Sequence, residues 1–154
     1  MAMDGDQKMR STIILMRGIP GSGKSTRAKE LKYEYHKDGY RSFVVSADDY
    51  FTRVSNGEPE YNFDFKKLGE AHAWCRGKLM GLFENGMFDT VVIVDNTNIA
   101  YWEMLPYVEY ANSKGLLVRV EYPKAEWWLD PVVCYRMCTH EVPEEKIIQM
   151  RDKF

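Results

Sequence analysis

The chain has 154 residues, of which 45% are apolar and 14% are aromatic, and its formal net charge is −2. A chain of this length forms one ordinary domain with a buried core, and this composition argues against a disordered protein. The nearly balanced charge argues against a strongly electropositive nucleic-acid-binding domain, although it leaves room for a local basic groove. We therefore expect a flexible polar arm over residues 1–9 and one folded domain over residues 10–154.

Targeting signals and cysteines both bear on the cellular compartment. The N-terminal residues hold no apolar run and no later run could span a bilayer, so neither secretion nor a membrane partner is predicted. An odd number of cysteines, three, indicates reduced thiols and a cytoplasmic or nuclear protein. Cys134 and Cys138 lie near His140, but their spacing and number do not match a structural zinc site.

The first predicted unit is a strand over residues 12–17, a glycine-rich loop and a helix over residues 24–36. The loop GIPGSGKST, residues 18–26, follows the P-loop pattern of Gly, four residues and Gly-Lys-Ser. Its glycines permit close approach of a phosphate, and its amides and the helix N-terminus supply hydrogen-bond donors for the anion. A glycine-rich turn that matches by chance is the alternative, and the flanking strand and helix argue against it.

Individual residues of this loop suit the binding of ATP with Mg²⁺. Lys24 is expected to reach the β- and γ-phosphates and to take part in catalysis, and the Ser25 hydroxyl to ligate Mg²⁺. Thr26 can add a contact to an inner phosphate. The predicted ATP-binding residues are Gly18, Gly21, Ser22, Gly23, Lys24, Ser25 and Thr26.

The second predicted unit is a strand over residues 42–46, a polar loop over residues 51–62 and a long helix. Asn62 or Asp64 can cap this helix, Gly86 can close it, and an apolar stripe runs along it. The stripe consists of Phe65, Leu68, His72, Cys75, Leu79 and Leu82. Because His72 belongs to the stripe, it is interpreted as a packed histidine.

The remaining elements continue the alternation of strands and helices. The strand over residues 90–94 is apolar almost throughout, which is typical of a strand buried on both faces of a parallel sheet. Pro106 suits the first position of a helix. The other predicted elements are a helical turn near Tyr101, a helix over residues 106–113, a strand over 116–122, a helix over 132–138 and a final helix from Pro143.

This alternation predicts an α/β fold in which helices cover both faces of a parallel sheet. Combined with the P-loop, it predicts a P-loop NTPase three-layer sandwich with about four or five strands and a C-terminal helical lid. Ligands of such sheets bind at the C-terminal strand ends. Three strands end in polar residues there, namely the P-loop, Asp48-Asp49 and residues 95–98, so this edge is the predicted active edge.

Asp48 and Asp49 are neighbours, so their side chains point in different directions. Asp48 is interpreted as the general base that accepts a proton from an attacking hydroxyl, and Asp49 as a residue near the substrate. The alternative is a turn or a helix cap, which Asp favours in general. The P-loop one strand away favours catalysis.

Asp95 ends the apolar strand over residues 90–94, where a Walker-B-type Asp would hold Mg²⁺ or its waters. A simple strand-ending turn is the alternative. Asn96 and Asn98 either orient substrate or fasten this loop, and the sequence does not separate the two roles.

Arg136 lies in a segment outside the strand–helix alternation, which could close over the site as a lid. On closure, its charge would neutralise the transition state, and a solvated helix Arg is the alternative. Flat aromatic side chains can stack on nucleobases, but they more often simply pack. The candidates for stacking are Tyr50, Tyr61, Trp127 and Trp128.

Taken in order, these motifs resemble P-loop kinases of the polynucleotide 5′-hydroxyl kinase type. The similar segments are GIPGSGKST at 18–26, SADDYF at 46–51, VDNTNI at 94–99, YWEM at 101–104 and HEVP at 140–143, with Met150. The chain resembles in particular the eukaryotic branch with the kinase-like domain of the ubiquitin-ligase-binding P-loop proteins. It is more distantly similar to the N-terminal domain of the myelin cyclic-nucleotide phosphodiesterase.

The resemblance implies transfer of the γ-phosphate of ATP to a 5′-hydroxyl of RNA or DNA, with Asp48 as base and Arg136 as lid Arg. Two departures from the family pattern matter. Phe51 stands where phage-type kinases carry an Arg, for which Arg53 is a possible replacement at the substrate, and Met137 and Cys138 stand where lids often hold Arg and Asn. A kinase of nucleosides or other alcohols, and a nucleotide-binding module without transfer activity, therefore stay open as alternatives.

Overall fold

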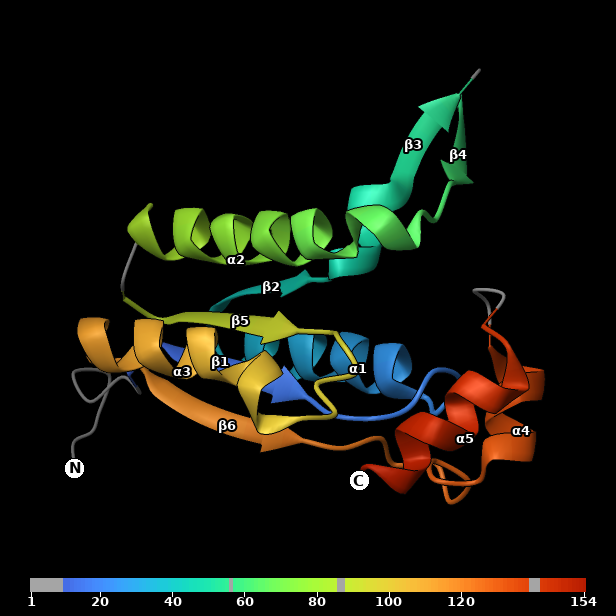
Figure 1. Ribbon diagram of the computed structural model, residues 1–154. Coiled ribbons are helices and arrows are strands. Elements are labelled where there is room, and N and C mark those ends of the chain that lie inside the picture. Colours follow the sequence, from blue (N-terminus) through green and yellow to red (C-terminus); the bar gives the residue numbers. More distant parts are fainter. Residues whose placement is uncertain (1–9, 56, 86–87, 139–141) are drawn as a thin grey trace.

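The computed structural model describes residues 10–154 except 56, 86–87 and 139–141, so the predicted arm lies outside the described residues. Four parallel strands form the central sheet in the order β2-β5-β1-β6. They are β1 (Thr12–Met16), β2 (Arg41–Val45), β5 (Thr90–Val94) and β6 (Leu117–Glu121). Figure 1 shows all four arrows pointing toward the same end of the molecule, so their C-terminal ends share one edge.

The central strands are the apolar ones. Every residue of β1 and β5 is buried, whereas the edge strands β2 and β6 are partly exposed. A strand covered on both faces needs apolar side chains on both, which is why these two segments show no alternation of polar and apolar residues.

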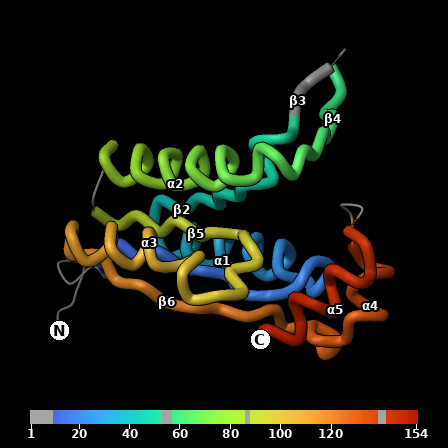
Figure 2. The backbone as a smooth tube through the Cα atoms, in the orientation of Figure 1, coloured from blue at the N-terminus to red at the C-terminus, as the bar shows by residue number. Residues whose placement is uncertain are grey.

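Helices cover both faces of this sheet, as predicted. On one face α1 (Lys24–Lys37) packs on β2 and β5, and its Ala28 and Leu31 join a cluster with Ile14 and Ile93. On the other face lie α2 (Leu68–Glu84) and α3 (Tyr101–Lys114), which Figure 2 shows as tubes running alongside the strands. The three-layer α/β architecture of a P-loop fold is therefore confirmed.

The predicted loop over residues 51–62 is wrong, because the structure has a β-hairpin there. A 3₁₀ turn, η1 (Ala47–Phe51), leads into β3 (Thr52–Ser55), which pairs antiparallel with β4 (Glu58–Tyr61). The hairpin projects away from the sheet (Figure 1), and β4 buries none of its residues. A strand without a buried face carries no apolar alternation, so the sequence pattern does not reveal it.

The long helix begins later than predicted. Asp64 caps a 3₁₀ turn, η2 (Phe65–Lys67), through its side chain, and α2 follows. In the predicted stripe Cys75 and Leu79 are buried, but Phe65 and Leu68 are 72% and 40% exposed. The residues that α2 buries, Ala71, Cys75, Leu79 and Phe83, are spaced by four. The predicted end at Gly86 lies outside the described residues.

The start of α3 at Tyr101 also differs from the prediction, because Pro106 lies inside this helix and not at its start. Proline removes one helical hydrogen bond. The first turn is stabilised independently, since the Ala100 amide donates to the Glu103 carboxylate at 2.9 Å. Burial of Met104 and Tyr107 against the sheet then holds the helix on both sides of the proline.

Two short helices, α4 (Pro131–Met137) and α5 (Glu144–Asp152), pack on each other at the end to which the strands point (Figure 1). They carry Cys134 and Ile147 into a buried cluster with Ile19 of the P-loop and Ile99. The segment predicted as a lid is thus a helical pair that contacts the glycine-rich loop. Within the described ranges, none of the helices has both the length and the apolar character that crossing a bilayer requires.

Candidate active site

The glycine-rich loop joins β1 to α1 at the edge predicted to be active. Gly21 and Gly23 have φ angles of 79° and 90°, which other residues adopt only with strain. The loop is fastened at its start, where the Gly18 amide donates to the Thr97 carbonyl at 3.1 Å. It leaves the buried Ser22 hydroxyl without a hydrogen-bond partner among the described residues. An unpaired polar group in a loop that ends at a helix N-terminus fits the phosphate cradle predicted from sequence.

Gly21 also touches the helical pair. A Cβ atom built on Gly21 would lie 1.9 Å from the Cys134 carbonyl oxygen of α4, which leaves no room for any side chain. This contact could not be read from the sequence, because the two residues are more than 100 positions apart.

We expect Gly21→Ala to lower the free energy of unfolding by about 2–5 kcal/mol, the sum of backbone strain and steric overlap. Gly39→Ala is the matched control, since Gly39 has a φ of 92° and no atom within 4 Å of a built Cβ. That control should lose only the strain, about 1–2 kcal/mol. Urea unfolding measures both, and equal losses would show that the contact between the loop and α4 carries no energetic weight.

Lys24, Ser25 and Asp95 meet at the first turn of α1. The Lys24 Nζ lies 3.3 Å from one carboxylate oxygen of Asp95, and the Ser25 hydroxyl donates to the other at 2.6 Å. Asp95 is only 8% exposed, so its charge is held away from bulk water. A hydroxyl and a carboxylate are the oxygen donors that Mg²⁺ takes in P-loop proteins, so these residues fit the predicted ion.

Asp48 lies in the first turn of η1, directly after β2. The Ser46 hydroxyl accepts from the Asp48 amide at 3.2 Å and so caps this turn. The Tyr61 hydroxyl, from the hairpin, donates to the Asp48 carboxylate at 3.2 Å. Burial, together with the neighbouring Asp48 charge, raises the pKa of Tyr61, so the phenol stays protonated and remains a donor at neutral pH. Asp48 is half-buried while Asp49 is exposed.

Backbone and side-chain contacts tie these two parts of the edge together. The Asp95 amide donates to the Val45 carbonyl at 2.8 Å, and the Asn96 side-chain oxygen accepts from the Ala47 amide at 2.9 Å. The turn that carries Asp48 is therefore fastened to the residues that hold Lys24 and Ser25. The sheet order explains this proximity, because β5 lies between β1 and β2.

Asn96 and Asn98 are both used inside the protein. Asn96 is 7% exposed, and its amide also donates to the Cys75 sulfur at 3.7 Å. Asn98 is 2% exposed, has a φ of 47°, and donates to the Met16 carbonyl at 2.8 Å. These contacts favour the second of their two predicted roles, which is to fasten the loop.

We expect Asn96→Ala to lower the free energy of unfolding by about 1–3 kcal/mol, because the buried Ala47 amide loses its acceptor. Asn112→Ala, at an exposed position of α3, serves as the control and should change stability by less than about 0.5 kcal/mol. Thermal or urea unfolding of both variants provides the measurement. Equal stability of the two would contradict the fastening role.

Sequence reasoning missed two contributors to this edge. Arg17 donates to the Asn98 carbonyl at 2.8 Å and to the Ile99 carbonyl at 2.6 Å, and so holds the loop after β5. Tyr61 was a candidate for stacking only, but it contacts the predicted base. Neither residue belongs to a local pattern, so no signal in the sequence identifies these contacts.

The other predicted residues lie around this edge. Thr26 is exposed on the first turn of α1, and Arg136 is exposed on α4. The side chain of Arg53 and the whole of His140 lie outside the described residues. The ring centroids of Trp128 and Tyr122 lie 5.4 Å apart. This contact favours packing over base stacking for Trp128.

Burial also shifts the pKa values of two cysteines and of the histidine on α2. Burial raises the pKa of Cys134 to about 11 and also raises the pKa of Cys75, so both stay thiols at neutral pH. His72 is half-buried on α2, as expected of a packed histidine, and burial lowers its pKa.

Known proteins are similar to this chain in sequence. The family model described as an AAA domain matches residues 13–129. Human NEDD4-binding protein 2 is 37% identical over 142 residues, which are 92% of this chain and 8% of that protein. The rat 2′,3′-cyclic-nucleotide 3′-phosphodiesterase is 30% identical over 120 residues, which are 77% of this chain and 25% of that protein. The chain thus spans a small part of either relative.

The solved structures add a fold comparison. The APS kinase CysC of Mycobacterium tuberculosis, in complex with AMPPNP and APS, superposes with a TM-score of 0.54 at 16% identity. The similarity covers 73% of this chain and 62% of that chain. Because the family match covers most of the sequence, the chain belongs to this AAA domain family of P-loop, kinase-like proteins.

Proposed function

We propose that this protein is an ATP-dependent kinase that transfers the γ-phosphate to the 5′-hydroxyl of a polynucleotide, with Asp48 as general base. One observation carries the proposal: hydrogen bonds connect the Lys24–Ser25–Asp95 group to the turn that bears Asp48. A phosphate cradle and a carboxylate on one edge are the two parts that phosphoryl transfer to a hydroxyl requires.

The P-loop forms the ATP side of this site. Its glycines and amides surround the phosphates, Lys24 contacts the β- and γ-phosphates, and Thr26 contacts an inner phosphate. Ser25 and Asp95 would hold Mg²⁺, which supplies charge neutralisation on the phosphates when it is bound. Lys24 is paired with Asp95, so its ammonium is directed to the side of the loop on which the predicted Mg²⁺ ligands lie.

Asp48 forms the acceptor side. Its carboxylate accepts the proton of the 5′-hydroxyl while the hydroxyl oxygen forms a bond to the γ-phosphorus. The bond from the γ-phosphorus to the bridging oxygen breaks, and ADP leaves. Tyr61 orients the carboxylate through its hydrogen bond to one of the two oxygens.

The remaining predicted residues complete the proposal. Asp49 and Arg53 lie on the segment after Asp48 and would contact the acceptor, while Asn96 and Asn98 hold the loop that carries Asp95. Arg136 would approach the phosphates from α4, whose Cys134 already touches the P-loop. The helical pair acts as a lid in this proposal.

The relatives are consistent with an acceptor that contains a nucleotide. The rat protein is named as a phosphodiesterase of a cyclic nucleotide, and it shares residues over most of this chain. The identity of the acceptor is tested separately from the transfer itself.

Incubation with γ-labelled ATP tests the function directly. We expect label to appear on 5′-hydroxyl RNA or DNA oligonucleotides and not on the same oligonucleotides that already carry a 5′-phosphate. Label on free nucleosides or other alcohols but not on oligonucleotides would select a small-molecule kinase. ATP binding without any transfer would indicate a nucleotide-binding module.

A further inference from the structure

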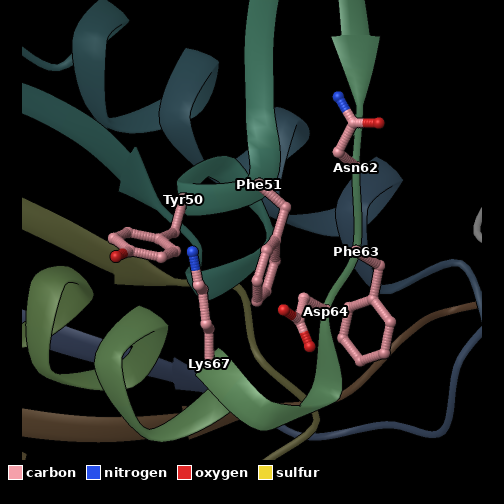
Figure 3. A pocket seen from close by; sticks show the side chains of 6 residues that line it. All are labelled: Tyr50, Phe51, Asn62, Phe63, Asp64 and Lys67. Carbon is pink, nitrogen blue, oxygen red and sulfur yellow. The ribbon is translucent and has the colours of Figure 1, made fainter.

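A cavity of about 460 Å³ opens beside the turn that carries Asp48. Its lining residues come from η1 and from the segment between β4 and α2, and half of these residues are aromatic. The lining residues are Tyr50, Phe51, Asn62, Phe63, Asp64 and Lys67 (Figure 3). None of them belongs to the ATP side of the site described above.

The cavity and the predicted base share their support. Tyr50 and Phe51 lie two and three positions after Asp48 in η1. The Asn62 amide donates to the Phe51 carbonyl at 2.8 Å and closes the base of the hairpin. Tyr61, next to Asn62 in the chain, donates to Asp48. A ligand in the cavity would therefore lie against the same turn that carries Asp48, although Asp48 is not itself a lining residue.

The aromatic side chains that line the cavity pack against one another, and part of their surface is exposed. The Phe63 ring packs edge-on against Phe51 at 5.1 Å and nearly parallel to Tyr61 at 6.4 Å. Phe51 is 4% exposed and part of the core, whereas Phe63 is 52% exposed. A half-exposed ring that packs against the buried Phe51 and the half-buried Tyr61 offers a surface for stacking, at a small cost in conformational entropy.

Polar groups stand at the same opening. Lys67 extends between Tyr50 and Phe51 in Figure 3, so its ammonium faces the aromatic wall. Asn62 also lines the cavity, but Figure 3 shows its side-chain amide pointing away from Phe51 and Phe63. A flat ring with polar atoms on its edge could stack on the aromatic side chains and hydrogen bond to the polar ones. A nucleobase has that chemistry.

We propose that this cavity binds the nucleobase of the nucleotide whose 5′-hydroxyl is phosphorylated, by stacking on Phe63 and hydrogen bonding to Lys67. The inference rests on the proposed function, and it specifies which part of the acceptor the protein recognises. The base is common to a free nucleoside and to a strand end, so the experiment compares these two sources.

The test uses 5′-hydroxyl oligonucleotides that differ only in the first residue, which is either a normal nucleotide or an abasic one. We expect the abasic acceptor to raise KM by about tenfold, the effect of one lost stacking contact. Phe63→Leu should raise KM for the normal acceptor to a similar extent and leave KM for the abasic one unchanged. Phe63→Tyr, which keeps the ring, should retain the preference.

Phe65→Leu is the matched control. Phe65 is 72% exposed, lies two positions from Phe63 and does not line the cavity. It should discriminate between the two acceptors as the unmodified protein does. If Phe63→Leu keeps the tenfold preference, or if Phe65→Leu loses it equally, the cavity does not bind the base. The matching free nucleoside shows whether the strand contributes beyond the base.

Binding without transfer separates the two proposals. An oligonucleotide with 2-aminopurine at its 5′ end should lose fluorescence on binding, because the probe base stacks on Phe63. If label transfer fails but this quenching occurs and requires Phe63, the cavity proposal stands and the kinase proposal falls. If transfer occurs with equal KM for both acceptors and without quenching, the kinase stands and the cavity proposal falls. Absence of both effects overturns both.

Discussion

Asp48→Asn is expected to lower the rate of phosphoryl transfer by about 10²–10⁴-fold, the contribution of a positioned general base. The amide has almost the same shape as the carboxylate and can still accept the hydrogen bond from Tyr61, so the turn should be preserved. It cannot take up the proton of the acceptor. Single-turnover transfer from γ-labelled ATP measures the rate, and titration with a fluorescent ATP analogue should show unchanged affinity.

Asp38→Asn makes the same chemical change at a position away from the site. Asp38 is exposed at the C-terminal end of α1 and precedes β2, so it lies at the opposite edge of the sheet. Its transfer rate should equal that of the unmodified protein. Full activity of Asp48→Asn would rule out the base, and a parallel loss of ATP affinity would instead indicate a structural role.

Lys24→Ala should weaken ATP binding by about 10–150-fold, because charged hydrogen bonds to the phosphates are lost. The transfer rate at saturating ATP should fall by about a further 10²–10³-fold, since the same charge stabilises the transition state. The variant also leaves the buried Asp95 without its cation, so it should unfold at a lower temperature even without ATP.

Thermal unfolding with and without ATP gives a readout that does not depend on turnover. ATP at 100 times its dissociation constant should stabilise the unmodified protein by about 2.7 kcal/mol, and Lys24→Ala at the same concentration should gain much less. Lys29→Ala, on an exposed position of the same helix, is the control and should respond like the unmodified protein. An unchanged ATP response of Lys24→Ala would place the nucleotide elsewhere.

The helix boundaries show where local patterns fail. Pro106 favours the start of a helix, yet α3 begins at Tyr101 because Met104 and Tyr107 are buried against the sheet. Phe65 continues the apolar stripe by spacing, yet it is exposed, because the chain there is a 3₁₀ turn and α2 starts afterwards. In α3 tertiary packing outweighs a local preference, whereas at Phe65 the local 3₁₀ turn capped by Asp64 ends the helical spacing.

The hairpin and the cavity could not be predicted for a related reason. β4 buries none of its residues, so the pairing of residues 52–55 with 58–61 is what defines this hairpin. Phe51, Phe63 and Lys67 come together because the hairpin brings the chain back to η1. The spacing of residues in the sequence does not indicate that these segments meet.

By itself, the sequence determined the P-loop, the apolar central strands and the parallel α/β fold, because each depends on residues that are neighbours in the chain. The same is true of the expectation that polar residues gather at one sheet edge. Tertiary structure alone decided that Asn96 fastens the Asp48 turn, that Tyr61 contacts Asp48, and that Gly21 has no room for a side chain. These are contacts between distant segments, and they exist only once the chain has packed.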